Sequence, residues 1–63
     1  MNKTITEKND LKEYQIYRHQ LVLQGTIKVD NFETIYYYTN YKYQYEYHYK
    51  NGVLNKVRIW DAK

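Results

Sequence analysis

Tyrosine occupies every second position from Tyr41 to Tyr49, and the positions between carry polar or charged side chains. A period of two places successive side chains on opposite faces of a strand, and tyrosine favours strands. The pattern therefore predicts a strand with two unlike faces. One face carries Tyr41, Tyr43, Tyr45, Tyr47 and Tyr49, and the other carries Lys42, Gln44, Glu46, His48 and Lys50.

Asn51-Gly52 follows this strand directly and precedes the apolar-rich run 53–60. An Asn-Gly pair between two such runs is a strong hairpin signal. A two-residue loop would place Tyr45 opposite Arg58 and mix the two faces. We favour a three-residue loop, residues 50–52, because it separates apolar from polar side chains. The predicted pairs are Tyr49 with Val53, Tyr45 with Val57, Tyr43 with Ile59, Glu46 with Lys56 and Gln44 with Arg58.

Tyr36 and Tyr38 have even numbers, whereas the later tyrosines have odd ones. One continuous strand over 33–50 would place the two sets on opposite faces, and it would far exceed the usual strand length. A tight turn at Thr39-Asn40 removes both problems and predicts a three-stranded meander with its tyrosines on one face. The pairs predicted for this turn are Tyr38 with Tyr41 and Tyr36 with Tyr43.

Two interpretations compete upstream. Residues 17–30 alternate between apolar and polar with few exceptions, which predicts a strand in which Gly25 marks a bulge or sharp bend. The alternative is a helix at about 10–23, because residues 10–13 have the form of a capping box. Gln15 and Arg18 would then fall on the apolar stripe of that helix, so the strand matches more positions.

The chain of 63 residues predicts one small domain, 1–63, with residues 1–10 as a loose N-terminal arm. Four or five short antiparallel strands would form an all-β fold, as a small curved sheet or a barrel. The alternative fold is α+β, with the N-terminal helix at about 10–23. Trp60 falls on the polar face of the predicted sheet.

The amino-acid composition limits the ways in which such a small core can be stabilised. Domains of this size often need a disulfide, a metal or a partner chain. The sequence has no cysteine and only two histidines, so we expect no disulfide, metal or cofactor, and a homodimer or another partner becomes the expectation. No run is apolar and long enough to span a membrane, and no apolar secretory stretch opens the chain. We therefore expect a cytoplasmic protein without a membrane partner.

Glu46 and His48 are the one pair that suits the acid–base chemistry of a small nuclease. On an extended strand they would lie about 7 Å apart and could flank a phosphate. A chain this short leaves little room for a catalytic pocket, and the sequence has neither a serine nor a cysteine nucleophile. We therefore expect no enzyme activity.

The tyrosine face suits either a core or a recognition surface, because a tyrosine ring is apolar and its hydroxyl is polar. We expect its middle to be buried and its edges presented. The net charge of +3 is compatible with contact to nucleic acid. The candidate binding residues are Tyr41, Tyr43, Tyr45, Tyr47, Tyr49, Trp60, Lys42, Lys50, Lys56 and Arg58.

Residues with AT-rich codons make up about half of the chain, a usage that favours a phage or another mobile element as the source. The stretch 45–50, Tyr-Glu-Tyr-His-Tyr-Lys, resembles a tyrosine-rich strand of the small phage inhibitors of uracil-DNA glycosylase. Those inhibitors are acidic DNA mimics and this chain is basic, so only a general class carries over. That class comprises small phage proteins, anti-CRISPR proteins included, that bind and block a host enzyme.

We therefore predict a non-enzymatic protein that binds and inhibits a host protein, such as a defence nuclease or another nucleic-acid enzyme, through a tyrosine-rich sheet. Its location would then be the host cytoplasm. The alternative is a single-stranded nucleic acid-binding protein. In that case the tyrosines stack bases, and Lys42, Lys50, Lys56 and Arg58 hold phosphates.

Overall fold

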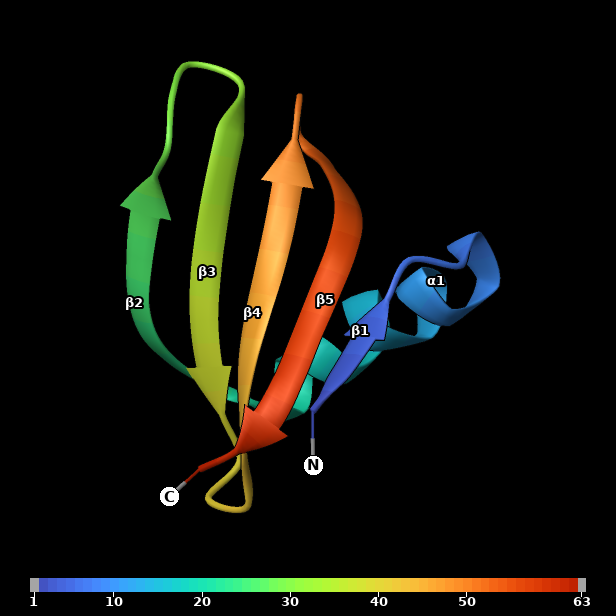
Figure 1. The fold of residues 1–63 in the computed structure, drawn as a ribbon, viewed down its shortest axis with the longest axis vertical. Helices are drawn as coiled ribbons and strands as arrows, with labels where there is room; N and C mark the ends of the chain where they lie inside the picture. Colours follow the sequence, from blue (N-terminus) through green and yellow to red (C-terminus); the bar gives the residue numbers. More distant parts are fainter. Residues whose placement is uncertain (1, 63) are drawn as a thin grey trace.

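The computed structural model describes residues 2–62. Its elements are β1 (Lys3–Ile5), α1 (Lys8–Tyr17), a 3-10 turn (Arg18–Gln20), β2 (Val22–Lys28), β3 (Glu33–Thr39), β4 (Tyr43–Lys50) and β5 (Val53–Asp61). The strands form one antiparallel sheet in the order β1-β5-β4-β3-β2 (Figure 1). This confirms the predicted small antiparallel sheet. The sheet is open and not a barrel, because β1 and β2 form its two edges.

Helix α1 lies at the β1–β5 end of the sheet (Figure 1). It begins directly after Glu7, whose backbone carbonyl accepts a hydrogen bond from the Leu11 N–H at 2.8 Å. Asp10 therefore lies within the first turn, where its negative charge suits the helix dipole. The capping box expected at residues 10–13 is wrong, because the N-cap of the helix is Glu7, three residues before Asp10.

The strand predicted over residues 17–30 is only partly right, because β2 forms its second half and Tyr17 ends the helix. Gln15 and Arg18, the polar residues that counted against a helix, are half-buried. Arg18 Nη1 donates to the hydroxyl of Tyr49 at 3.1 Å. Tyrosine hydroxyls thus allow a helix with polar residues on its inner stripe to pack on the sheet.

The segment expected to be a loose arm is structured over the part that is described, residues 2–10. It supplies β1 and the first residues of α1. Ile5, the one apolar side chain in this part, lies opposite Val57 and is buried. The pairing of β1 with β5 and the burial of Ile5 in the core together hold the segment against the sheet.

The hairpin between β4 and β5 has a two-residue loop, so the predicted three-residue loop is wrong. Asn51 and Gly52 both have positive φ, 54° and 78°, as the Asn-Gly type I′ turn requires. A bulge in the register after the first two pairs then restores the separation of apolar and polar faces. The five predicted pairs are therefore wrong. The observed pairs are Lys50 with Val53, Tyr49 with Leu54, His48 with Lys56, Tyr47 with Val57, Glu46 with Arg58, Tyr45 with Ile59, Gln44 with Trp60 and Tyr43 with Asp61.

The turn between β3 and β4 is longer than the predicted tight turn. Thr39 pairs with Gln44, so residues 40–43 make the connection. The predicted pairs at this turn are therefore wrong, because Tyr38 lies opposite Tyr45 and Tyr36 lies opposite Tyr47. The shared face is confirmed for the tyrosines of β3 and β4 at positions 36, 38, 45 and 47, but the prediction is wrong for Tyr41, which lies in the turn before β4. Directly opposite residues of an antiparallel pair point to the same side of the sheet.

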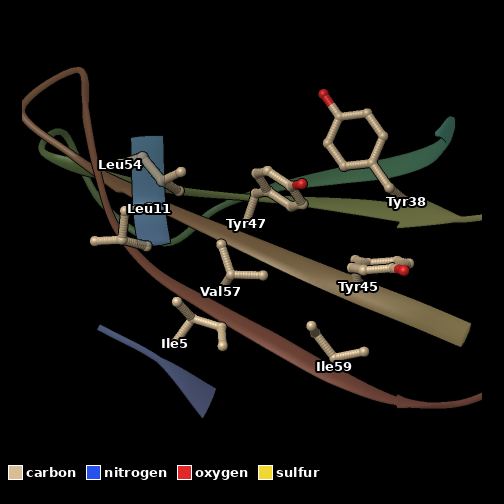
Figure 2. Close-up of a cluster of buried hydrophobic side chains, with 8 residues drawn as sticks. All are labelled: Ile5, Leu11, Tyr38, Tyr45, Tyr47, Leu54, Val57 and Ile59. Carbon is tan, nitrogen blue, oxygen red and sulfur yellow. The ribbon is translucent and has the colours of Figure 1, made fainter. Parts of the chain in front are cut away.

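The core lies on the side of the sheet that α1 covers. Its buried apolar side chains gather along one side of β5, β4 and β3 (Figure 2). They are Ile5, Leu11, Tyr38, Tyr45, Tyr47, Leu54, Val57 and Ile59. Among residues 2–62, no helix has the length and apolar character that a bilayer span needs.

Candidate interaction surfaces

The middle of the tyrosine face is core. Tyr45 and Tyr47 are 4% and 0% exposed, and the Tyr47 hydroxyl donates to the backbone carbonyl of Tyr14 on α1 at 2.7 Å. Burial raises the pKa of both the Tyr45 and the Tyr47 hydroxyl above the ordinary value of 10. These two predicted binding residues hold the helix on the sheet and offer no ring surface to a partner.

Ring contacts extend this core sideways. Tyr38 packs edge-on against Tyr47 with ring centres 5.1 Å apart, and Tyr36 packs at right angles to Tyr49 at 5.4 Å. The outer rings, Tyr36, Tyr43 and Tyr49, are half-buried. The face therefore has a buried middle and partly presented edges, as the sequence predicts.

Tyr41 lies in the turn between β3 and β4, is 89% exposed and has a φ of 78°. Asn40 fixes this turn, because its Oδ1 accepts from the backbone N–H groups of Lys42 at 3.1 Å and Tyr43 at 2.8 Å. Its Nδ2 donates to the Tyr45 hydroxyl at 3.1 Å. The exposed ring of Tyr41 is thus carried by a turn that is tied to the core.

The side of the sheet opposite α1, here called the open face, carries a polar network at its centre. Glu46 Oε1 lies 2.9 Å from His48 Nε2 and accepts from Arg58 Nη1 at 3.2 Å. The side chains of Glu46 and His48 are only 13% and 11% exposed. The two side chains incline toward each other into direct contact, so they are not held about 7 Å apart as their positions on an extended strand alone would suggest.

A shallow hollow lies beside this network at the β1–β5 edge. The guanidinium carbon of Arg58 is 5.8 Å from the ring centre of Trp60, and Trp60 is half-buried on the open face, where the sequence predicted it. The hollow has a volume of about 200 Å³. Its lining residues are Asn2, Lys3, Thr4, Arg58, Ile59 and Trp60.

Tyr37 also lies on the open face, and the sequence reasoning did not single it out. It is opposite Glu46. Burial, and then the negative charge of Glu46, raise the pKa of the Tyr37 hydroxyl. The period of two could have identified this residue, because a side chain between Tyr36 and Tyr38 must point away from the tyrosine face.

Strand β2, the edge farthest from the helix (Figure 1), carries the second feature that the sequence reasoning missed. Val22, Leu23 and Ile27 are 51%, 52% and 51% exposed, and Phe32 in the following loop is 65% exposed. Asp30 Oδ1 orders that loop by accepting from the backbone N–H groups of Phe32 and Glu33. The alternation in this segment predicted a strand but not its place at an edge.

The predicted binding residues do not form one surface. Lys56, Arg58 and Trp60 share the open face of β5, whereas the odd-numbered tyrosines of β4 point to the helix side. Lys42 is exposed in the turn before β4, and Lys50 is exposed at the last residue of β4. The tyrosines of β4 and the basic residues of β5 therefore lie on opposite faces of the sheet and do not form a joint contact surface for one nucleic acid strand.

Among residues 2–62, no three His, Asp or Glu side chains are grouped so as to hold a metal ion. Comparisons of the chain with protein-family models, with curated proteins and with solved structures found no match. The function is accordingly inferred from the chemistry of the surfaces themselves.

Proposed function

We propose that this protein binds a larger host protein, without catalysing a reaction, through the uncovered half of its tyrosine-rich sheet, β2 and β3. The observation that supports the proposal is the edge strand β2, which is seven residues long and has a sheet neighbour only in β3. Val22, Leu23 and Ile27 are about half exposed along it. A strand edge with exposed aliphatic side chains suits strand addition, in which a partner strand extends the sheet through main-chain hydrogen bonds.

The net charge of the chain indicates which kind of partner protein would bind. The chain carries a net charge of +3, and Lys28 is the one charged residue of β2. An acidic protein with an accessible strand edge is therefore a better match than a second copy of this chain, because two copies repel each other. A host enzyme of this kind would be inhibited where the added sheet covers its active centre.

The double substitution Val22→Gln and Ile27→Gln tests this surface, because it removes two aliphatic side chains and leaves the net charge unchanged. Wild-type and variant proteins are used to capture partners from a lysate of the source organism. A captured acidic protein is then purified and titrated by calorimetry. We expect the double variant to bind about 10- to 100-fold more weakly, from the lost burial of two partly exposed aliphatic groups.

Ile16→Gln is the matched control, because Ile16 is 71% exposed on α1 and lies away from β2. This variant should bind the partner as the wild type does. Equal affinity of the wild type and the β2 double variant would contradict the proposal. So would a wild-type dimer, seen by light scattering, that the double variant converts to a monomer, because a second copy would then occupy the edge.

A further inference from the structure

We infer that the β1–β5 end of the open face is a binding subsite for single-stranded nucleic acid. In this subsite a base stacks on the ring of Trp60, and the side chains of Arg58 and Lys56 hold phosphates. This activity goes beyond protein binding through β2, because the two surfaces lie at opposite edges of the sheet (Figure 1). Stacking of bases on aromatic rings beside basic residues is the common chemistry of proteins that bind single strands.

Arg58 is held in place by its neighbours on the open face. Its Nη1 donates to Glu46 at 3.2 Å, and its guanidinium lies against the Trp60 ring. The side chain nevertheless keeps 52% of its surface exposed. An arginine that is already ordered loses less entropy when it binds a phosphate.

The hollow beside Trp60 has a lining that suits a nucleotide. Thr4, which lies opposite Arg58, provides a hydroxyl and Asn2 an amide next to the indole ring, whereas Lys3 lies opposite Ile59 and points to the helix side. Its volume of about 200 Å³ is smaller than the roughly 300–1,000 Å³ of pockets that hold free small molecules. The hollow therefore fits one unit of a longer strand better than a free ligand.

Lys56 extends the basic surface along β5. It lies opposite His48, two residues before Arg58, so that both cations point to the open face about 7 Å apart. Glu46 accepts a hydrogen bond from Arg58 and offsets part of its charge, but about half of the arginine side chain stays exposed to a ligand. The two cations can thus contact different phosphates of one strand.

This subsite differs from the one that the sequence pattern suggested. The alternating tyrosines were the expected stacking surface, but Tyr45 and Tyr47 are buried on the side away from Arg58. Trp60 is the aromatic residue that shares a strand face with the basic side chains. The proposed nucleic acid interface therefore lies on the face opposite to the tyrosines.

Fluorescence of Trp60, the only tryptophan, reports directly on this subsite. The full chain is titrated with a short oligothymidylate at low and at moderate salt. We expect quenching of the indole and an affinity that falls as salt rises. The slope of log K against log salt should be about −0.7 for each phosphate held, or about −1.4 for the two cations.

Two substitutions separate stacking from charge. Trp60→Leu should weaken binding of a labelled oligothymidylate, measured by anisotropy, by about 5- to 150-fold. Lys56→Gln should make the salt slope shallower by about 0.7. Lys12→Gln, at an exposed position of α1, is the matched control and should change neither quantity. Circular dichroism checks the fold of each variant, and the Lys56→Gln result stands even if Trp60→Leu does not fold.

Three results would overturn the inference. They are an absence of quenching at low salt, equally tight binding of a duplex of the same length, and an equal change of slope in the Lys12→Gln control. The variant with Val22→Gln and Ile27→Gln should bind the oligonucleotide as the wild type does. Failure of the nucleic acid subsite is therefore distinguishable from failure of the protein-binding surface.

Discussion

The two sides of β4 are buried to a similar degree by different means. On the helix side, Tyr45 and Tyr47 pack their rings under α1 and against each other. On the open face, Glu46 and His48 are also almost covered, but each is covered by a neighbouring polar or aromatic side chain of the same sheet. One side of the strand is stabilised mainly by apolar burial, and the other by hydrogen bonds that each depend on one partner.

This difference leads to unequal expectations for the two sides. A ring in the core contacts many neighbours, so its removal leaves a cavity that lowers the stability of the folded state. In the open-face network, Arg58 keeps 52% of its side chain exposed, so that water can replace part of what a substitution removes. Substitutions should therefore cost most on the helix side of β4 and least on its open face.

Tyr47→Ala should have the largest effect. The side chain is fully buried and its hydroxyl bonds the Tyr14 carbonyl. Removal of a buried aromatic ring costs about 3–5 kcal/mol, which is comparable with the whole stability of a domain this small. We expect the variant to be largely unfolded at 25 °C, as measured by circular dichroism and urea titration.

Tyr47→Phe is the matched control for the ring. It keeps the packing and removes only the hydrogen bond to α1, so it should lose about 1 kcal/mol of unfolding free energy. A Tyr47→Ala variant that unfolds in urea at nearly the wild-type concentration would show that the tyrosine side of β4 is not the main source of stability.

The faces of the sheet could be predicted from the sequence, but the registers could not. Alternation of residues fixes which side chains share a face, and both turns preserve that outcome. The pairing depends on loop lengths and bulges, and the bulge near Tyr49 allows a two-residue turn to coexist with separated faces. Two different combinations of loop and bulge give the same faces, so alternation alone could not choose between them.

The helix and the binding surfaces show what periodicity leaves out. Arg18 looked misplaced on a helix because its partner, the hydroxyl of Tyr49, comes from a strand far along the chain. Likewise, the exposure of Ile27 follows from the position of β2 at the edge, which depends on the order of all strands. Both features rest on long-range packing that a local pattern does not contain.

Alkaline pH should weaken the helix side next. Burial raises the pKa of the Tyr45 and Tyr47 hydroxyls above 10, so the folded state holds these protons more tightly than the unfolded state does. Their contribution to stability is complete below pH 10 and is lost as pH rises through the folded-state pKa values. The urea midpoint should therefore fall above about pH 10, and it should fall less steeply in Tyr47→Phe. Tyrosine ionisation in a chain that stays folded, with an unchanged midpoint, would contradict this account.

Glu46→Gln should give the smallest effect, on the open face. Glutamine keeps the shape and one acceptor oxygen but loses the charge that strengthens the bonds to His48 and Arg58. We expect a loss of about 1 kcal/mol of unfolding free energy in urea titration, and a smaller loss at high salt because salt weakens the charge term in the wild type. A loss as large as that of Tyr47→Ala would make the open face a second core and remove the contrast between the two sides.

Because Glu46 also positions Arg58 beside Trp60, the same variant sharpens the nucleic acid proposal. Loss of the Glu46 charge leaves the positive charge of Arg58 unneutralised, but the guanidinium is then no longer held in one position. The slope of log K against log salt for oligothymidylate should therefore become steeper, even if the affinity changes little.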